Sequence, residues 1–218
     1  MPTQTWTNLP GPRRDRVLAA AVAEFGRHGY SGGSLNVIAQ EAGVAKGSLF
    51  QYFTDKFDFF LHVTEHTALR VRAALDPWLD RLDPGAGFAE SVLDAAQAWM
   101  SYFADHPADR GMVAAINLEL DPAIRAVVLG PVHQRYREAL LPHFARAREH
   151  GTLHAGADLD ALLALFLVLL PHLALAPFEP GIDGALGLHG RPVAELRAQA
   201  ARLIRPVLAG FGVAGQTG

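Results

Sequence analysis

Apolar residues in this chain recur at the three-to-four-residue spacing of an α-helix, and no run of four to eight residues alternates as a β-strand would. The first such stripe lies within residues 13–28 and stops at Gly29, a residue suited to the left-handed position after a helix. Its members are Val17, Leu18, Ala21, Val22 and Phe25. Longer helices are predicted over residues 56–82, 87–105, 109–120, 122–150, 158–176 and 192–211, each bounded by Pro, Gly or Asp. The spacing therefore predicts an all-α fold.

Short helical segments near the N-terminus predict a helix-turn-helix unit. Ser34 is a candidate N-cap for a second helix of about two turns, which ends before Gly43. A third short helix can then run to Phe53, and Asp55 can cap a fourth helix that begins at Lys56. Short helices in sequence, separated by a glycine turn, form this kind of unit.

Charge is distributed unevenly between the two parts of the chain. Residues 1–56 carry six basic and four acidic side chains, whereas the other 162 residues carry thirteen basic and eighteen acidic ones. Lys46 and Lys56, the only two lysines of the sequence, both lie in the basic part. This asymmetry indicates that the N-terminal part meets an anion.

Composition bounds the environment of the chain. It has no cysteine, which excludes disulfides, thiol nucleophiles and cysteine-ligated zinc, and its first residues lack the pattern of a signal peptide. Residues 161–178 contain no Asp, Glu, Lys or Arg and reach the roughly 18-residue length of a spanning helix. Pro171, His172 and Pro177 interrupt this segment, and no Lys, Arg, Trp or Tyr anchors it. We therefore expect a buried helix, no membrane partner and a cytoplasmic location.

The third short helix can present a polar face to a ligand. Val44, Leu49 and Phe53 can turn inward. The outward set is then Ala45, Lys46, Gly47, Ser48, Gln51 and the edges of Phe50 and Tyr52. Small residues allow close approach, Lys, Ser and Gln bond to phosphates or base edges, and an aromatic ring can touch a thymine methyl group. Such a face suits the major groove of DNA, and a phosphate near Lys56 would offset the unfavourable helix dipole there.

The run SLNVIAQEAGVAKGSLFQYFTDKFDFF, with the preceding RVLAAAVAEFGRHGYSGGS, resembles the DNA-binding domain of TetR-family transcriptional regulators. The match extends without a gap from residue 13 to about residue 61. The resemblance implies an all-helical homodimer whose larger C-terminal domain binds an effector and dimerises through its last two helices. We therefore expect a flexible arm at 1–12, a helix-turn-helix domain at 13–56, a ligand-binding and dimerisation domain at 57–211, and a tail at 212–218.

Position by position, the resemblance implies a set of DNA-binding residues: Ser34, Lys46, Gly47, Ser48, Phe50, Gln51, Tyr52 and Lys56. Two positions depart from the family pattern. Ala45 stands where a Ser or Thr cap is frequent, which would forfeit roughly 1 kcal/mol at the helix start. Phe50 stands where Tyr is frequent, so that only a ring contact remains.

Two further residue sets are expected in the larger domain. Candidate effector contacts are Trp99, Phe103, Met112, Asn117, Tyr136, Phe166 and His172, all of residue types that line pockets but also fill cores. Candidate dimer-interface residues are Leu162, Leu163, Phe166, Leu169, Leu170, Leu196, Leu203, Ile204, Val207 and Leu208, whose alternative is an intramolecular core.

A rival hypothesis concerns HVTEH at residues 62–66, which matches the H-x-x-E-H zinc-protease pattern. His62 and His66 lie one helical turn apart and could share a metal, with Glu65 as base, but no third ligand can be named. A second alternative is a ligand sensor that contacts another protein and no longer binds DNA. We favour a non-enzymatic repressor, without metal or cofactor, that binds a palindromic operator as a homodimer and is released by a hydrophobic small molecule.

Overall fold

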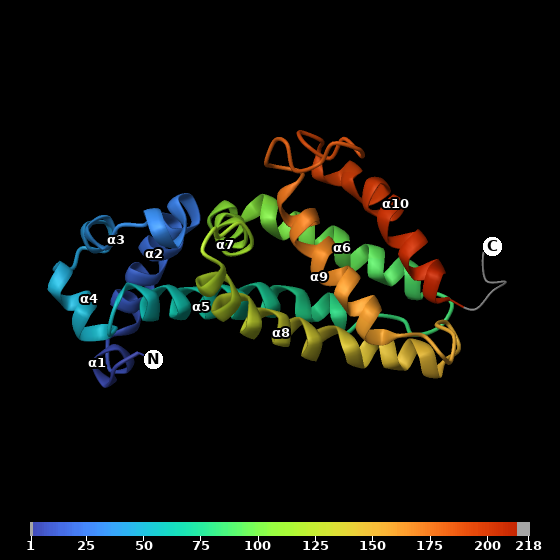
Figure 1. Cartoon of the computed structure of the whole chain (residues 1–218), viewed down its shortest axis with the longest axis horizontal. Coiled ribbons are helices and arrows are strands. Elements are labelled where there is room, and N and C mark those ends of the chain that lie inside the picture. The colour runs from blue at the N-terminus through green and yellow to red at the C-terminus, as the bar shows by residue number, and fades with distance from the viewer. Residues whose placement is uncertain (1, 213–218) are drawn as a thin grey trace. The chain divides into compact units, whose positions relative to one another are not determined.

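The computed structural model describes residues 2–212, and within them the fold is all-α, as predicted (Figure 1). The described residues form ten helices and no strand, apart from one isolated antiparallel bridge between Leu153 and Gly212. The helices are α1 Gln4–Thr7, α2 Gly11–Gly32, α3 Leu35–Glu41, α4 Lys46–Tyr52, α5 Lys56–Leu79, α6 Phe88–Asp105, α7 Pro107–Asn117, α8 Pro122–Glu149, α9 Leu159–Leu175 and α10 Val193–Phe211.

Packing divides the chain into two compact units. Among the described residues, the first unit contains 2–71 and 106–132, and the second contains 72–105 and 133–212. Helices α5 and α8 each contribute residues to both units. The expected boundary between the helix-turn-helix domain and the ligand-binding domain lies between residues 56 and 57. It divides the chain by the order of its helices and not by packing, and it stays a prediction. Most of the expected C-terminal tail, residues 213–218, lies outside the described part of the chain.

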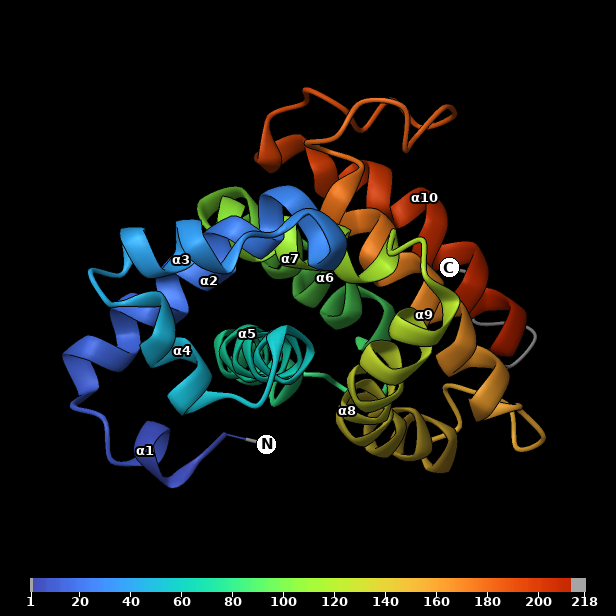
Figure 2. The same cartoon turned by 60° about the vertical axis from the view of Figure 1, so that its left-hand side comes forward.

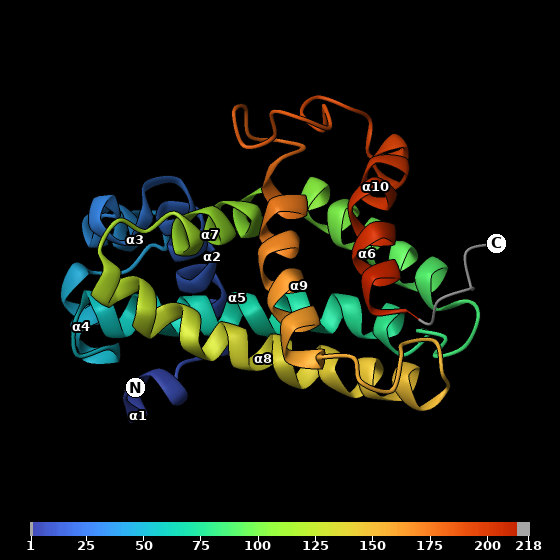
Figure 3. The same ribbon diagram turned by 45° about the vertical axis from the view of Figure 1, so that its right-hand side comes forward.

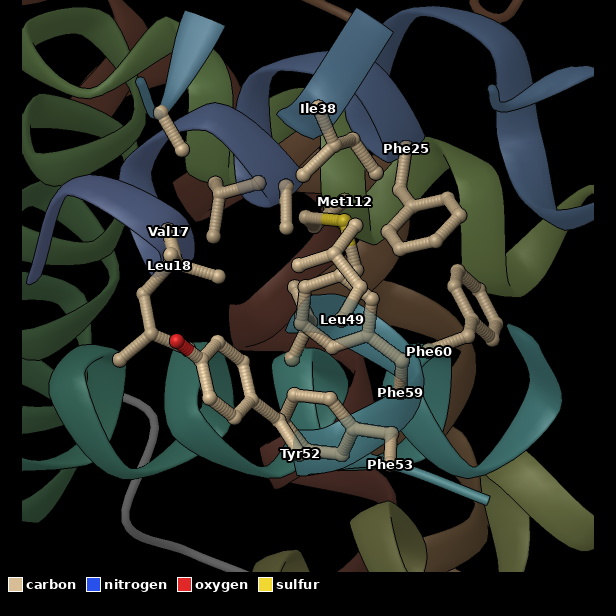
Figure 4. Packing of buried hydrophobic residues seen from close by; sticks show 14 of the residues in the cluster. Val17, Leu18, Phe25, Ile38, Leu49, Tyr52, Phe53, Phe59, Phe60 and Met112 are labelled. Carbon is tan, nitrogen blue, oxygen red and sulfur yellow. The ribbon is translucent and has the colours of Figure 1, made fainter. Parts of the chain in front are cut away.

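Apolar side chains from seven helices fill the core of the first unit, and Figure 4 shows part of this cluster. Phe25, Leu49, Phe60 and Met112 are each at most 2% exposed. Helix α2 breaks at Gly29, where φ is 67°, so the predicted end of this helix is confirmed as a change of direction before a further turn to Gly32. Met112, one of the expected effector contacts, is a member of this core, and its contact with an effector stays a prediction.

The N-terminal residues are more ordered than the sequence indicates. Residues 4–7 form α1, whose N-cap residue Thr3 accepts a hydrogen bond from the Trp6 amide. Trp6 itself is 3% exposed and belongs to the core of the first unit. A short helix with one large buried side chain thus lies within the segment expected to be a flexible arm, residues 1–12.

Helix α6 packs against α9 and α10 in the second unit (Figure 3). Asp158 caps α9 by accepting a hydrogen bond of 3.0 Å from the Ala161 amide. The Trp99 indole of α6 donates a 2.8 Å hydrogen bond to the Leu170 carbonyl of α9. One face of α9 thus packs in a helical core, whereas Leu165 and Val168 are exposed, so the expectation of a fully buried helix over residues 161–178 is met only in part. None of the helices within residues 2–212 is long and apolar enough to cross a membrane.

The predicted dimer-interface residues separate into two groups in this structure. Six of them are buried within their own chain, as the alternative of an intramolecular core predicts, and their part in a dimer interface stays a prediction: Leu162, Leu163, Phe166, Leu196, Ile204 and Leu208. The other four keep partial exposure: Leu169, Leu170, Leu203 and Val207. Leu165 and Val168, which the sequence pattern did not single out, are 42% and 71% exposed on α9. The buried stripe of α9 was correctly seen as apolar, but it faces the protein's own core.

Candidate nucleic-acid interface

Helices α3 and α4 form the predicted helix-turn-helix, with Gly43 between them (Figure 2). Ser34 caps α3 because its hydroxyl accepts a 3.5 Å hydrogen bond from the Val37 amide. Gly43 has a φ of 65°, which lets the chain turn between the helices, and the next residue, Val44, donates a 2.9 Å hydrogen bond to the Ala39 carbonyl. The cap and the turn both confirm the sequence analysis.

The outer face of α4 brings together most of the residues expected to contact DNA. Lys46, Gly47 and Gln51 are exposed, and Phe50 keeps 51% of its surface exposed. A Cβ added to Gly47 would meet nothing within 4 Å, so the start of the helix is sterically open. Ser48 is half-buried beside them. This surface offers a cation, an amide and an aromatic ring, the groups that contact phosphates, base edges and thymine methyl groups.

The inner face of α4 fixes how that surface is presented. Leu49 and Phe53 are 2% and 1% exposed, in agreement with the predicted inward direction. Ala45 occupies the N-cap position without a side-chain hydrogen bond, which confirms the missing cap. Tyr52 is only 3% exposed, so the expectation that one of its edges faces outward is wrong. Its ring packs against Trp6 at 5.6 Å between centroids, and a contact of Tyr52 with phosphate would rest on the hydroxyl group.

Lys56 has intramolecular partners in this structure. Its ammonium group donates a 3.2 Å hydrogen bond to the Ser31 carbonyl and lies 5.0 Å from the centroid of the Tyr30 ring. Burial lowers the pKa of Lys56, whereas the charges of Glu24 and Glu119 act in the opposite direction. From the sequence alone, Lys56 is expected to be a cation that binds a phosphate. The carbonyl at the end of α2 supplies part of that negative potential within the protein.

The start of α5 is capped as predicted. The Asp55 carboxylate accepts a 2.8 Å hydrogen bond from the Asp58 amide. The Asp58 carboxylate in turn accepts hydrogen bonds from the amide and the hydroxyl of Thr54, at 3.1 and 3.0 Å. These bonds fix the loop between α4 and α5 and hold Lys56 in the first turn of α5.

The histidine pair of α5 does not form a metal site. His62 lies against Trp6 and Phe53, with ring centroids 5.4 and 5.3 Å away, and burial lowers the pKa of its imidazole. Within the described part of the chain, no group of three His, Asp or Glu side chains could hold a metal ion. His62 therefore serves as a packing residue, and the zinc-hydrolase alternative built on His62, Glu65 and His66 is not supported.

The expected effector contacts lie in both units. Trp99 and Phe103 are 3% and 0% exposed, and the Trp99 ring lies 4.8 Å from Phe103 and 6.1 Å from Tyr136 between centroids. Tyr136 is half-buried, and burial raises the pKa of its phenol. Asn117 belongs to the first unit, where its amide donates a 2.9 Å hydrogen bond to the Val113 carbonyl. The structure therefore groups three of the seven residues around one aromatic contact and places Met112 and Asn117 elsewhere.

One exposed residue near the expected interface was missed. Val37, in the first turn of α3, is 41% exposed and its amide is used in the Ser34 cap. It falls just off the apolar stripe of α3, which contains Leu35, Ile38 and Ala39. An apolar residue off the stripe at the start of the second helix was the available signal.

The helix pair, its glycine turn and its exposed polar face define the helix-turn-helix class of DNA-binding proteins. Residues 17–63 match the model of the bacterial regulatory proteins of the tetR family. The match covers α3, α4 and the adjoining parts of α2 and α5, so the likeness to that family is shown for these residues.

Known relatives resemble different extents of the chain. An HTH-type transcriptional repressor of Streptomyces coelicolor is 36% identical over 80 residues, which are 34% of this chain and 42% of that protein. An HTH-type transcriptional regulator of Bacillus subtilis, YezE, is 28% identical over 64% of this chain and 68% of its own. The chain thus aligns with less than half the length of the Streptomyces repressor.

One solved structure extends the likeness to nearly the whole fold. SmeT, the repressor of a Stenotrophomonas maltophilia multidrug efflux pump, has a TM-score of 0.68 and covers 98% of this chain and 95% of its own. Its sequence identity is 18%, so that the likeness concerns the fold alone.

Proposed function

We propose that this chain is a sequence-specific DNA-binding transcriptional regulator that acts as a ligand-responsive repressor. The exposed face of α4 carries this proposal. Lys46, Phe50 and Gln51 stand outward together, while Leu49 anchors the same helix in the core of the first unit. A rigidly anchored helix with a polar and sterically open face suits docking into a major groove. The repressor named among the relatives supports the direction of regulation.

A homodimer is part of the proposal. Leu165 and Val168 expose apolar surface on α9, and Leu203 and Val207 keep partial exposure on α10. Two copies that meet through such faces form an isologous interface and present two recognition helices related by a two-fold axis. The operator of such a dimer is a palindrome whose half-sites are about one helical turn apart. A regulator of chromosomal genes acts in the cytoplasm.

The effector is proposed to be a hydrophobic small molecule that binds the second unit. The contact of Trp99 with Phe103 and Tyr136 supports this, because aromatic side chains with a few polar groups are typical of such sites. If the effector weakens DNA binding, operator DNA must weaken effector binding by the same factor. Phe166 and His172 remain predicted contacts on α9.

Selection from a random library of DNA duplexes tests the proposal and reveals the operator sequence in the same experiment. The purified protein is expected to enrich a palindromic sequence, and the complex is expected to contain two chains per duplex in analytical ultracentrifugation. Lys46→Ala serves as the matched variant, because Lys46 is exposed and its loss should weaken binding to all duplexes. Enrichment of no sequence by the wild-type protein at low salt would overturn the proposal.

A further inference from the structure

The N-terminal segment of the chain is bonded to the end of the recognition helix. The Thr3 amide donates a 2.9 Å hydrogen bond to the Tyr52 carbonyl, and the Thr3 hydroxyl donates a 2.6 Å hydrogen bond to the Gln51 carbonyl. Both acceptors belong to the last turn of α4. Residues from the two sides of this contact are 48 or more positions apart in the sequence.

These bonds provide donors for carbonyl groups at the C-terminal end of α4. The last four carbonyls of any α-helix have no partner within it, and α4 has only seven residues. The Leu49 carbonyl is bonded to the Phe53 amide at 2.9 Å, and the carbonyls of Gln51 and Tyr52 are among those that remain for an outside donor. Thr3 supplies a donor to each of them. The end of α4 is therefore capped by a segment that precedes α2.

Trp6 fastens the same segment by packing. Its ring lies 4.9 Å from Phe53 and 5.4 Å from His62 between centroids, and it is 3% exposed. Phe53 is the C-cap residue of α4, and His62 lies on α5. One buried side chain thus contacts the end of the recognition helix and the helix that follows it, while the Thr3 hydroxyl accepts from the Trp6 amide.

We propose that residues 3–7 act as a clasp that caps the C-terminal end of α4 and thereby positions Gln51 for contact with bases. Gln51 is exposed, yet its own carbonyl is bound to Thr3. Fixing this backbone group restricts the direction of the side chain. Base contacts need fixed geometry, whereas phosphate contacts through long cations tolerate movement. The clasp should therefore affect selectivity for the operator more than general affinity for DNA.

Hydrogen exchange of the free protein tests the capping step without DNA. Thr3→Val removes the hydroxyl at nearly constant shape, Thr3→Ser retains it, and Thr5→Val changes an exposed threonine within α1, the helix that Thr3 caps. We expect amides of α4 to exchange about fivefold faster in Thr3→Val, the factor that a lost helix cap corresponds to, and at wild-type rates in Thr3→Ser and Thr5→Val. Trp6→Phe, which retains a ring, should give a smaller increase. Unchanged exchange in both Thr3→Val and Trp6→Phe would overturn the clasp.

Fluorescence anisotropy then tests positioning, which rests on the proposed function. On the duplex selected by the wild-type protein, Thr3→Val is expected to bind about fivefold more weakly, while its affinity for a scrambled duplex stays within twofold of wild type. Thr3→Ser should restore selective binding. Equal selectivity of Thr3→Val and wild type would overturn the positioning role. If the wild-type protein selects no duplex but α4 exchange still responds to Thr3, the regulator proposal fails and the capping of α4 stands.

Discussion

Gly26 of α2 and Gly111 of α7 approach each other backbone to backbone in the first unit. A Cβ added to Gly111 would lie 2.7 Å from the carbonyl oxygen of Gly26. A Cβ added to Gly26 would lie 3.0 Å from the Ala108 carbonyl oxygen. Helices α2 and α7, far apart in the sequence, pack side by side because neither carries a side chain at this crossing.

Gly111→Ala should therefore destabilise the protein. The new methyl group would meet backbone atoms, which cannot move aside as a side chain can, so we expect a loss of about 1–3 kcal/mol in the free energy of unfolding. Urea denaturation measures this change. Gly130→Ala is the matched control, because a Cβ there would meet nothing within 4 Å in the middle of α8. It should be neutral or raise stability by up to about 1 kcal/mol. An equal loss of stability in both variants would contradict the close backbone approach of α2 and α7 at Gly111.

Lys56→Ala should reduce stability as well as DNA affinity. The substitution removes the hydrogen bond to the Ser31 carbonyl and the contact with Tyr30. We expect a loss of about 1 kcal/mol, a modest value for a charged donor because the side chain remains partly exposed. Lys46→Ala, at an exposed position, should change stability by less than about 0.5 kcal/mol. Equal stability of the two variants in urea would show that the intramolecular role of Lys56 is negligible.

Phe50→Ala should lower selectivity for the operator without unfolding the protein. Its ring is 51% exposed on α4, so little packing is lost, but a contact with a thymine methyl group would disappear. We expect the ratio of operator to scrambled-duplex affinity to fall about fivefold or more. Leu69→Ala, which truncates a side chain that is 49% exposed on α5, should leave the ratio unchanged. Anisotropy titrations that give the same ratio for Phe50→Ala and wild type would remove Phe50 from the interface.

Stability should fall on acidification below about pH 6.5, the ordinary pKa of histidine. Burial lowers the pKa of His62 in the folded protein; Glu65 and Asp58 oppose this shift, and His66 reinforces it. Below pH 6.5 the unfolded chain therefore binds protons that the folded chain does not, which favours unfolding. Urea midpoints at pH 7.5 and 5.5 measure the effect, and His62→Gln should make the difference smaller. A midpoint that rises towards pH 5.5 would contradict the lowered pKa of the half-buried His62.

Val168→Glu should separate the proposed dimer. Val168 is 71% exposed on α9, so the substitution is tolerated by the single chain, but a buried charge at an isologous interface is repeated on both copies. We expect a monomer of about 23 kDa in sedimentation velocity where the wild type is a dimer. Val127→Glu, at a residue 50% exposed on α8, is the control and should not change the mass. A dimeric Val168→Glu protein would exclude this face of α9.

Local patterns predicted the helix-turn-helix well because its signals are local. The Ser34 cap and the left-handed glycines Gly29 and Gly43 act over a few residues, and the structure confirms each. The inward direction of Leu49 follows from the same helical period.

Long-range packing could not be predicted in the same way. An apolar stripe in the sequence does not reveal whether it packs against its own chain or against a second copy. Leu162 and Ile204 are buried within their own chain. Trp6 lies in a segment whose sequence indicates a polar, loose terminus, and only the fold brings the partner rings of Phe53 and His62 to it. Methionine is a residue type that can line a pocket, but Met112 lies in the core of the first unit.

The most direct measurement is a salt titration of DNA binding by fluorescence anisotropy, with the DNA that flanks the chain's own gene and a scrambled duplex of equal length. The account predicts selective binding whose affinity falls steeply with salt, and a slope of log affinity against log salt that is smaller by about one in Lys46→Ala. Binding to neither duplex even at low salt would show that the exposed face of α4 does not dock on DNA.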